Sequence, residues 1–280
     1  MRFLVLFLVL MTTISFSTVA QLNDSFTDGD FTNNPAWTTP TPADWLVNPS
    51  LQLQSNNTVA NSSFWISTPS SQALVSQWDF WIRLDFNPSS TNLVDVFLTA
   101  SAADLTLAST TGYFVRLGNT DDELALYRKD AGGAIVKIID GLNGVLNASS
   151  NTLRIRVTRN AANQWNLLRD LTATGTAFSS EGTVTDATYS TSVFFGLLVR
   201  QSTASFFQRH FFDDLEVKPF VPDTTPPSIT NLTATSPNNL TVTFNEPVDL
   251  ATSQLPANYT VNNGIGNPAA CLLYTSPSPR

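Results

Sequence analysis

Apolar and polar side chains alternate in several short segments, and this alternation constrains the fold more than any other feature. In residues 78–86, WDFWIRLDF, every second side chain is apolar, and residues 153–157, LRIRV, repeat the pattern. Successive side chains of a β-strand point to opposite faces, so each segment predicts a strand with one buried face. The face opposite the buried one holds Asp79, Trp81, Arg83, Asp85, Arg154 and Arg156.

Similar segments recur from residue 21 to residue 217 and alternate with turn-forming stretches, such as NPSSTN at 87–92 and GNTDDE at 118–123. About a dozen strands at this spacing, with no helical stretch, predict a two-sheet sandwich. Residues 193–199 are apolar on both faces, which predicts a central strand covered from both sides. The other expected strands span residues 51–54, 64–67, 94–99, 112–117, 124–129, 134–139, 165–169 and 206–217.

The first twenty residues, MRFLVLFLVLMTTISFSTVA, differ from the rest of the chain. One arginine precedes an apolar run at residues 3–11, and residues 18–20 supply small side chains at a cleavage site. The run is too short to span a bilayer. We therefore expect residues 1–20 to be a secretory signal peptide, and the mature chain from Gln21 onward to be exported and to have no transmembrane span.

The charge balance argues against nucleic-acid binding. Apart from Arg2 and Arg280, the chain has 12 bases against 22 acids, which is a net charge of −10. A phosphate backbone would repel such a chain on average. Because the only cysteine is Cys271, we expect an exported domain that is held together by its core rather than by disulfides, with structural calcium as a further candidate.

A proline-rich stretch divides the chain. Residues 218–228, KPFVPDTTPPS, contain four prolines, which cannot sit inside a sheet and make a stiff linker. We place the linker at residues 219–228, between a domain at 21–218 and a module at 229–270. The module has a turn at 236–239 and enough apolar positions for only three or four strands. So few strands cannot cover their own face, and we therefore expect a partial β-sandwich module.

Three short motifs of this second part point to a known module. They are TTPP at 224–227, VTFNEPVD at 242–249 and NYTV at 258–261. The segment resembles the bacterial Ig-like module of S-layer type, although it covers only the first half of such a module. Modules of this type are spacers and adhesive or stalk units of exported multidomain proteins, so the resemblance implies a spacer role here.

The larger domain opens with DSFTDGDF at 24–31, followed by Trp37, and closes with FFDDLEV at 211–217. These features resemble the laminin-G or concanavalin-A-like jelly roll of exported bacterial proteins, in which the first and last strands lie side by side. Together the two resemblances imply an all-β fold, with a two-sheet jelly-roll sandwich at 21–218 followed by the partial Ig-like β-sandwich module. They also imply a surface protein of Gram-negative bacteria.

The motifs of several catalytic sites do not occur in the sequence. A jelly-roll glycosidase needs two carboxylates that flank the scissile bond, and the laminarinase-like family of this fold places them as E-x-D-x-x-E on one strand. None of the glutamates after the signal peptide opens that motif. The single histidine, His210, lies in a predicted strand and completes no zinc cluster or Ser-His-Asp triad. An Asp-based pair stays open, but we predict no catalytic residue.

Five aspartates are candidates for a calcium site. Asp24, Asp28 and Asp30 lie near the start of the larger domain, and Asp213 and Asp214 lie near its end. If the end strands are adjacent, these carboxylates meet, and a hard cation would relieve their repulsion. The alternative is that they are solvated edge and turn residues. The calcium hypothesis predicts that calcium raises the melting temperature of the domain.

The polar face of the alternating strands is the candidate ligand face. Aromatic and planar polar groups on the concave sheet of a jelly roll hold sugars by stacking and by bidentate hydrogen bonds. The alternatives are a cross-strand ladder of Arg and Asp pairs, or a second core layer that contains Trp81. The predicted ligand-binding residues are Trp81, Arg83, Asp85, Tyr127, Arg154 and Arg156, and Arg116 and Arg200 are expected to project similarly.

The chain ends in CLLYTSPSPR, residues 271–280, which is hard to explain as protein. A free cysteine in an exported and otherwise cysteine-free chain is a reactive liability. The codons TGT CTC TTA TAC ACA TCT CCG AGC CCA CGA encode the same residues and resemble the transposase end and adapter of a tagmentation sequencing library. We therefore expect residues 271–280 to be an adapter-derived artefact and exclude them from the fold.

These observations predict an exported, non-catalytic protein fragment that is extracellular or lies on a bacterial cell surface. We expect adhesion or carbohydrate recognition, with an extracellular glycan or a surface protein as the partner. Two alternatives stay open, namely the accessory N-terminal region of a larger secreted hydrolase and a structural stalk with no specific ligand. Apart from calcium, we predict no cofactor.

Overall fold

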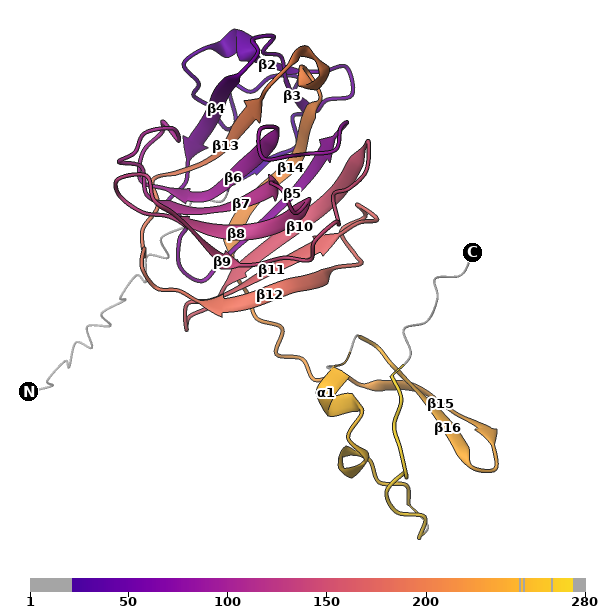
Figure 1. Cartoon of the computed structure of the whole chain (residues 1–280). Coiled ribbons are helices and arrows are strands. Elements are labelled where there is room, and N and C mark those ends of the chain that lie inside the picture. The colour runs from indigo at the N-terminus through magenta and orange to yellow at the C-terminus, as the bar shows by residue number, and fades with distance from the viewer. Residues whose placement is uncertain (1–21, 247, 249, 263, 274–280) are drawn as a thin grey trace, which may run out of the picture. The chain divides into compact units, whose positions relative to one another are not determined.

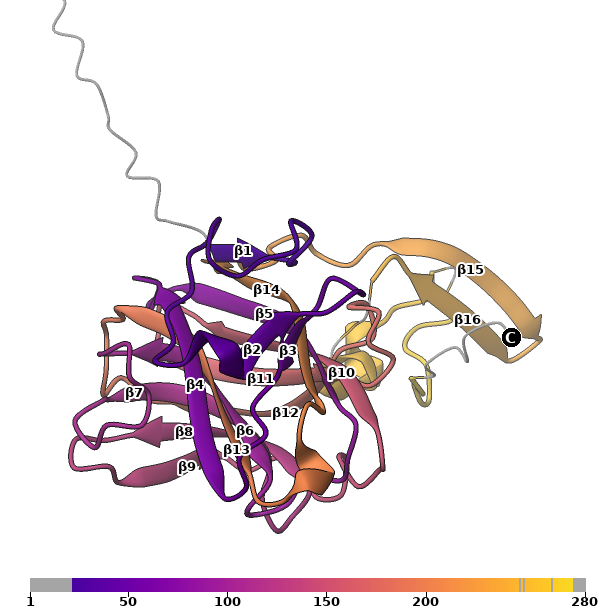
Figure 2. The ribbon, with the colours of Figure 1, turned by 90° about the horizontal axis from the view of Figure 1, so that it is seen from above.

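The computed structural model describes residues 22–246, 248, 250–262 and 264–273, so the predicted signal peptide and most of the C-terminal decamer lie outside it. The chain forms two compact units, which separate between Val221 and Pro222. The first unit is a sandwich of two antiparallel sheets (Figures 1 and 2), so the predicted all-β sandwich is confirmed. In the part of the chain that is described, no helix is long and apolar enough to cross a membrane.

One sheet of the sandwich has eight strands. Seven follow the order β12-β11-β10-β5-β14-β3-β2, and β1 pairs separately with β14. We call this the eight-stranded sheet, and the face turned away from the other sheet is its outer face. Its strands are β1 (Leu22–Asp24), β2 (Trp45–Val47), β3 (Leu53–Ser55), β5 (Ser76–Leu84), β10 (Asn151–Arg159), β11 (Gln164–Asp170), β12 (Ser179–Thr185) and β14 (His210–Pro219).

The other sheet has six strands in the order β4-β13-β6-β7-β8-β9. Short 3-10 turns precede β2 and β14, at η1 (Pro42–Asp44) and η2 (Ala204–Phe206). The strands of this six-stranded sheet are β4 (Ser62–Pro69), β6 (Leu93–Ala100), β7 (Gly112–Gly118), β8 (Glu123–Lys129), β9 (Ile135–Ile139) and β13 (Phe194–Gln201).

The main core lies between the two sheets. The apolar sides of β5 and β10 are both buried there, as the alternation in their sequences predicts. Trp78 of β5 stacks on Trp165 of β11 with ring centroids 5.5 Å apart. Each fully buried side chain of this size contributes roughly 1.5–3 kcal/mol relative to an exposed one, so this core supplies most of the stability of the sandwich.

The first and last strands of the sandwich lie side by side, as the jelly-roll resemblance implies (Figure 2). The register of β1 on β14 pairs Leu22 with Val217 and Asp24 with Leu215. Three strands were not expected from the sequence, namely β1, β2 and β12. The strand β12, SSEGTVT, lies at the edge of its sheet and is half-exposed or exposed throughout, so it needs no apolar alternation.

A second apolar cluster covers the outer face of the six-stranded sheet. The rings of Phe97, Phe114 and Tyr127 stack across β6, β7 and β8, with centroids 5.0 and 5.3 Å apart. The loop at residues 101–111 packs on this cluster through the fully buried Leu105. Since Leu198 of β13 belongs to the same cluster, this strand is covered from both sides, as predicted for residues 193–199.

The second unit has little regular structure. Its elements are β15 (Ile229–Ser236), β16 (Asn239–Phe244), α1 (Leu250–Ser253) and η3 (Pro256–Asn258). The two strands form a hairpin whose turn lies at the predicted position. Ile229, Leu232 and Leu240 are 60%, 57% and 45% exposed, and no residue of this unit whose side-chain exposure is described is buried. The Ig-like assignment of residues 229–270 stays a prediction.

Candidate functional site

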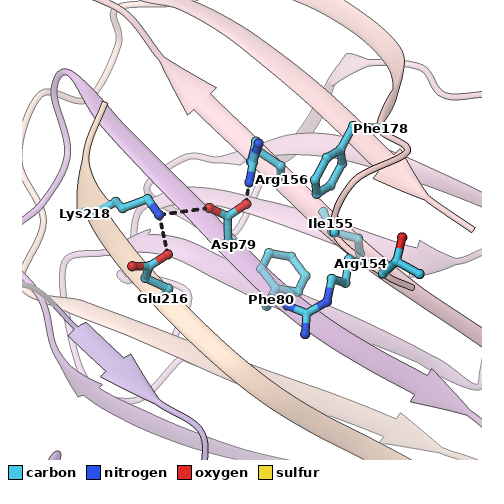
Figure 3. Close-up of a pocket in the computed structure, with 10 residues that line it drawn as sticks. Asp79, Phe80, Arg154, Ile155, Arg156, Phe178, Glu216 and Lys218 are labelled. Atoms are coloured by element: carbon cyan, nitrogen blue, oxygen red, sulfur yellow. Dashed lines mark hydrogen bonds and ion pairs between the residues drawn. The ribbon is translucent and has the colours of Figure 1, made fainter. Parts of the chain in front are cut away.

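A hollow of about 300 Å³ lies on the outer face of the eight-stranded sheet, where β10, β5 and β14 run side by side (Figure 3). Its remaining side is the loop at residues 171–178, which joins β11 to β12. The strands position its side chains, because every second residue of each strand points to this face. The charged residues that line it are Asp79, Arg154, Arg156, Glu216 and Lys218.

Opposite charges pair across the floor of the hollow. The strand register places Arg156 opposite Asp79, and Asp79 opposite Glu216. The Nε of Arg156 donates a hydrogen bond to Oδ1 of Asp79 at 2.6 Å. The Nζ of Lys218 lies 2.5 Å from Oε2 of Glu216 and 3.7 Å from Oδ2 of Asp79. A chain of alternating charges therefore crosses three strands (Figure 3).

A third ion pair forms one side of the hollow. Arg154 pairs with Asp214, and its Nε donates a hydrogen bond to the carbonyl oxygen of Ala173 at 3.1 Å. A β-bulge in β14 explains the pairing, because it inserts one extra residue between Asp213 and Glu216 and gives Asp214 a φ of 47°. Bulges turn side chains away from the regular alternation, and here the bulge directs the carboxylate of Asp214 toward the guanidinium.

Asp213 lies next to this pair and faces Trp81 in the strand register. Its carboxylate accepts a hydrogen bond from the backbone N–H of Asp214 at 2.8 Å. Burial raises the pKa of Asp213 to about 6, and the charge of Asp214 acts in the same direction, whereas Arg154 opposes the increase. Asp213 is therefore partly protonated at mildly acidic pH.

The loop at 171–178 is ordered by one buried carboxylate. Asp170 accepts hydrogen bonds from the backbone N–H groups of Thr172 at 2.8 Å, Gly175 at 2.7 Å and Thr176 at 3.2 Å, and from the hydroxyl of Thr172 at 2.6 Å. Burial acts to raise the pKa of Asp170, but these hydrogen bonds outweigh it and hold the pKa well below its usual range. The loop therefore has a defined shape without a core of its own.

This loop brings an aromatic ring to the hollow. Phe178 lies over the guanidinium of Arg156, with 4.3 Å between the guanidinium carbon and the ring centroid (Figure 3). Gly175 has a φ of 80°, and a Cβ there would lie 3.2 Å from Cδ of Arg154, so a glycine lets the loop approach the sheet closely. The hollow thus combines one aromatic face with paired planar charges.

Trp81 and Arg83 project from the same face but lie outside the hollow. The guanidinium carbon of Arg83 is 4.0 Å from the ring centroid of Phe211 and 5.9 Å from that of Trp81. Arg83 also pairs with Asp85 at 3.3 Å. Five of the predicted ligand-face residues therefore share one face, and each arginine among them pairs with an aspartate. They are Trp81, Arg83, Asp85, Arg154 and Arg156.

Tyr127, Arg116 and Arg200 do not project with the others. They lie on the outer face of the six-stranded sheet, where Tyr127 is 5% exposed within the second apolar cluster. Arg116 forms a bidentate pair with Asp95, with N–O distances of 2.6 and 2.8 Å. The prediction that they share a face with Trp81 is wrong, because the alternation within a strand does not say to which sheet the strand belongs.

The five aspartates of the predicted calcium site do not converge. Among the described residues, no group of three or more His, Cys, Asp or Glu side chains is arranged to hold a metal ion. The Oδ1 of Asp24 accepts a hydrogen bond from the N–H of Phe26, and its Oδ2 accepts one from the indole of Trp37. Asp30 accepts bonds within its own turn, and Asp214 pairs with Arg154. These carboxylates therefore do not fit a calcium ion as a set.

Of the residues that line the hollow, only Arg154 and Arg156 were predicted as site residues. The side chains that the prediction missed include Phe178, Lys218 and Glu216. Phe178 lies beside the polar strand β12, in a stretch without periodicity. Lys218 and Glu216 belong to the end of the last strand, where the sequence signal of the linker begins. Asp79 was recognised as an outward residue of β5, and its position opposite Arg156 in the register was the missing information.

Comparisons with known proteins concern the fold. No family model and no curated protein matches the chain. Among solved structures, the carbohydrate recognition domain of Emp47p is similar with a TM-score of 0.54 and 13% identity, over 75% of this chain and 100% of that one. The first unit has the lectin-type jelly-roll fold.

A second solved structure supports the same fold for the jelly-roll domain. It is the exoplasmic/lumenal domain of VIP36 in a form with Ca²⁺ and mannose bound. The TM-score is 0.51 and the identity is 9%, over 83% of this chain and 99% of that one. The two comparisons agree that the two-sheet architecture occurs in domains named for carbohydrate binding or solved with a carbohydrate.

Proposed function

We propose that the jelly-roll domain is an exported, non-catalytic carbohydrate-binding domain that acts outside the cell or at its surface. The hollow between β10, β5, β14 and the loop at 171–178 is its binding site. Residues 229–270 act as a spacer that follows the binding domain. The proposal names a glycan as the partner and assigns no role to nucleic acid.

The observation that carries the proposal is the pairing of an aromatic face with charged planar groups in one small hollow. Phe178 supplies the ring, and Arg156 and Asp79 supply donors and acceptors beside it. A sugar ring has an apolar face that stacks on an aromatic side chain and hydroxyl groups that hydrogen-bond at its edge. Small-ligand sites commonly combine a concave shape with a few placed polar groups in this way.

Two further observations support the same ligand class. The fold neighbours are a carbohydrate recognition domain and a domain solved with mannose bound. The sequence contains no E-x-D-x-x-E motif, which supports binding rather than hydrolysis of a glycan. Calcium is not needed for this proposal, because the hydrogen-bonding groups of the hollow are all side chains of the domain.

A glycan array with the purified protein tests the proposal, with Phe178→Ala as the first variant. We expect the wild type to bind one group of related glycans, and Phe178→Ala to bind them about tenfold more weakly, which corresponds to about 1.4 kcal/mol. Val136→Ala is the matched control, because Val136 is a partly exposed apolar residue of β9 in the other sheet.

Two results would contradict the proposal. Binding to no glycan at all would contradict the carbohydrate-binding function. Equally strong binding by the wild type and by Phe178→Ala would contradict the assignment of the hollow as the binding site. Equal melting temperatures of the two proteins ensure that a lost signal does not reflect unfolding.

A further inference from the structure

Every cation that lines the hollow is paired with a carboxylate, and Lys218 also lies 3.7 Å from a second one, that of Asp79. The charges therefore cancel locally although the chain between the predicted signal peptide and the decamer carries −10. The cation side chains are between 27% and 34% exposed, which leaves their edges accessible from the hollow. The three pairs are Arg154–Asp214, Arg156–Asp79 and Lys218–Glu216.

This balance disfavours an anionic ligand. Among the described residues that line the hollow, no cation lacks a carboxylate partner. A carboxylate or sulfate on the ligand would have to displace an existing partner and leave its charge uncompensated in a partly buried position. Displacing one partner of such an ion pair is costly, because the remaining charge is left partly desolvated and without compensation.

An uncharged sugar avoids this cost. A hydroxyl group both donates and accepts hydrogen bonds. It can donate to a carboxylate oxygen of Asp79 or Glu216 and accept from an N–H of Arg156 or Lys218 while every ion pair stays intact. The lining therefore presents donors and acceptors side by side, which is the pattern that a ring with several hydroxyl groups requires.

The size of the hollow limits how much of a glycan it accepts. Ligand pockets range from about 300 to about 1,000 Å³, and this hollow lies at the lower end at about 300 Å³. The loop at 171–178 closes one side, and the Arg154–Asp214 pair closes another. The ring of Phe178, from this loop, lies over Arg156 and takes up further space in the hollow. These limits favour a single sugar ring.

We propose that the hollow binds one uncharged sugar ring through the edges of three intact ion pairs and discriminates against the corresponding uronate. The inference rests on the proposed carbohydrate-binding function and adds the class of sugar. Trp81 contributes nothing to binding of a single ring, because it lies outside the hollow.

Matched pairs of sugars test this inference by isothermal titration calorimetry on the whole chain. The probes are glucose with glucuronate and galactose with galacturonate, together with the neutral and C6-carboxylated forms of any array ligand. We expect the neutral member to bind at least about fivefold more tightly, a difference of about 1 kcal/mol. Its Kd should change less than about twofold between roughly 50 and 500 mM NaCl, because no net charge meets the site.

The substitution Asp214→Asn removes the negative charge that pairs with Arg154 and so changes the charge balance of the hollow. The variant leaves Arg154 without its carboxylate, and asparagine tolerates the positive φ at this position. The ratio of neutral to uronate affinity should fall at least about threefold, since a free cation now faces the ligand. Asp85→Asn is the matched control, because Asp85 pairs with Arg83 on the same face outside the hollow, and the ratio should not change.

The outcomes separate this inference from the proposed function. Tighter binding of the uronate by the wild type, or an unchanged ratio in Asp214→Asn, overturns the uncharged-sugar inference and leaves carbohydrate binding intact. A loss of monosaccharide binding in Trp81→Ala overturns the single-ring assignment. Failure of every glycan on the array to bind overturns both proposals.

Discussion

The two outer faces of the sandwich arise from the same alternation of side chains, yet one is covered and the other is open. On the six-stranded sheet, Phe114 and Tyr127 are buried in an apolar cluster with the loop at 101–111. On the eight-stranded sheet, Arg156 and Asp79 line a hollow that the solvent reaches. The difference lies in which residue types occupy the outward positions.

The outward positions of a sandwich strand determine whether its face is covered. An outward row of aromatic residues requires a covering segment, because stacked rings gain most when water is excluded. An outward row of paired charges needs no covering segment and can leave the face accessible to solvent. Arginines illustrate the contrast, since the side chain of Arg116 on the covered face is 11% exposed and that of Arg154 on the open face is 27% exposed.

The largest expected effect concerns the covered face. Phe114→Ala should lower the free energy of unfolding by about 3–5 kcal/mol, because Phe114 is fully buried between two other rings and its removal leaves a cavity. Phe178→Ala on the open face should lower it by less than about 1 kcal/mol, since no core surrounds that ring. Urea unfolding followed by tryptophan fluorescence measures both. Equal losses would show that the two faces do not differ in this way.

The next effect follows from a buried imidazole in the eight-stranded sheet. His210 is fully buried, with its ring 4.9 Å from that of Phe86 and its Nδ1 3.0 Å from Oγ of Ser55. Burial lowers the pKa of His210 to about 3, so the folded state disfavours the charged form. As the pH falls below 6.5, the unfolded state binds a proton on this imidazole before the folded state does. The free energy of unfolding therefore falls between about pH 6.5 and pH 3.

At pH 4.5, protonation of this imidazole in the unfolded state should make the free energy of unfolding about 3 kcal/mol lower than at pH 7. The estimate counts about 1.4 kcal/mol for each of the two pH units between 6.5 and 4.5. The pH dependence of urea unfolding measures it against His210→Leu, which has no titrating group there. The difference between wild type and variant should vary with pH between 7 and 4.5. A constant difference over that range would mean that His210 is not buried in its neutral form.

A smaller effect concerns the loop that closes the open face. Asp170→Ala should lower the free energy of unfolding by about 2 kcal/mol, because the N–H groups it satisfies lose a charged acceptor. It should also weaken glycan binding about tenfold, because Phe178 and the rest of the loop lose their fixed position. Hydrogen exchange of residues 172–177 should accelerate. Unchanged exchange there, together with weaker binding, would assign Asp170 a different role.

Asp213→Asn should have a still smaller effect, and of opposite sign. Because the folded pKa of Asp213 is raised to about 6, ionisation opposes folding as the pH rises from the ordinary value of 3.8 through 6. The variant should therefore gain less than about 1 kcal/mol at pH 7.5, since the half-buried group is partly screened by solvent. At pH 4 the variant should equal the wild type. Melting curves at the two pH values test the sign.

Calcium should have the smallest effect of all. The ion takes about six to eight oxygen ligands, and among the described residues no three or more carboxylates are arranged to hold a metal ion. We expect millimolar calcium to change the melting temperature by less than about 1 °C, within the range of ordinary salt effects on exposed charges. An increase of several degrees would restore the calcium site predicted from the sequence.

The fold followed from the sequence to the extent that local patterns determine it. The alternation in residues 78–86 and 153–157 predicted two strands, which the structure pairs as β5 and β10. The jelly-roll resemblance implied that the first and last strands lie side by side, as β1 and β14 do. The strand β12 was missed, because a polar edge strand has no apolar period. Long-range pairing decides where such a strand lies, and that information is absent from a local window.

The candidate site was predicted only in part, for the same reason. Arg154 and Arg156 were identified because they occupy the polar positions of a recognisable strand. Tyr127 occupies an equally clear outward position, but its strand joins the other sheet. Phe178 lies in a stretch that has no period, and hydrogen bonds of the loop to Asp170 and Arg154 hold it over Arg156. The Asp–x–Thr–x–Thr–Gly order that begins at Asp170 was the one local signal of this loop.

The tethering of this loop by a single carboxylate has an evolutionary consequence. Asp170 holds its neighbours through backbone N–H groups, which every residue except proline supplies. The exposed side chains at positions 171 and 177 are therefore free to change while the loop keeps its course. Related chains could acquire new sugar preferences by changing those positions alone, without a new solution for folding the sandwich beneath.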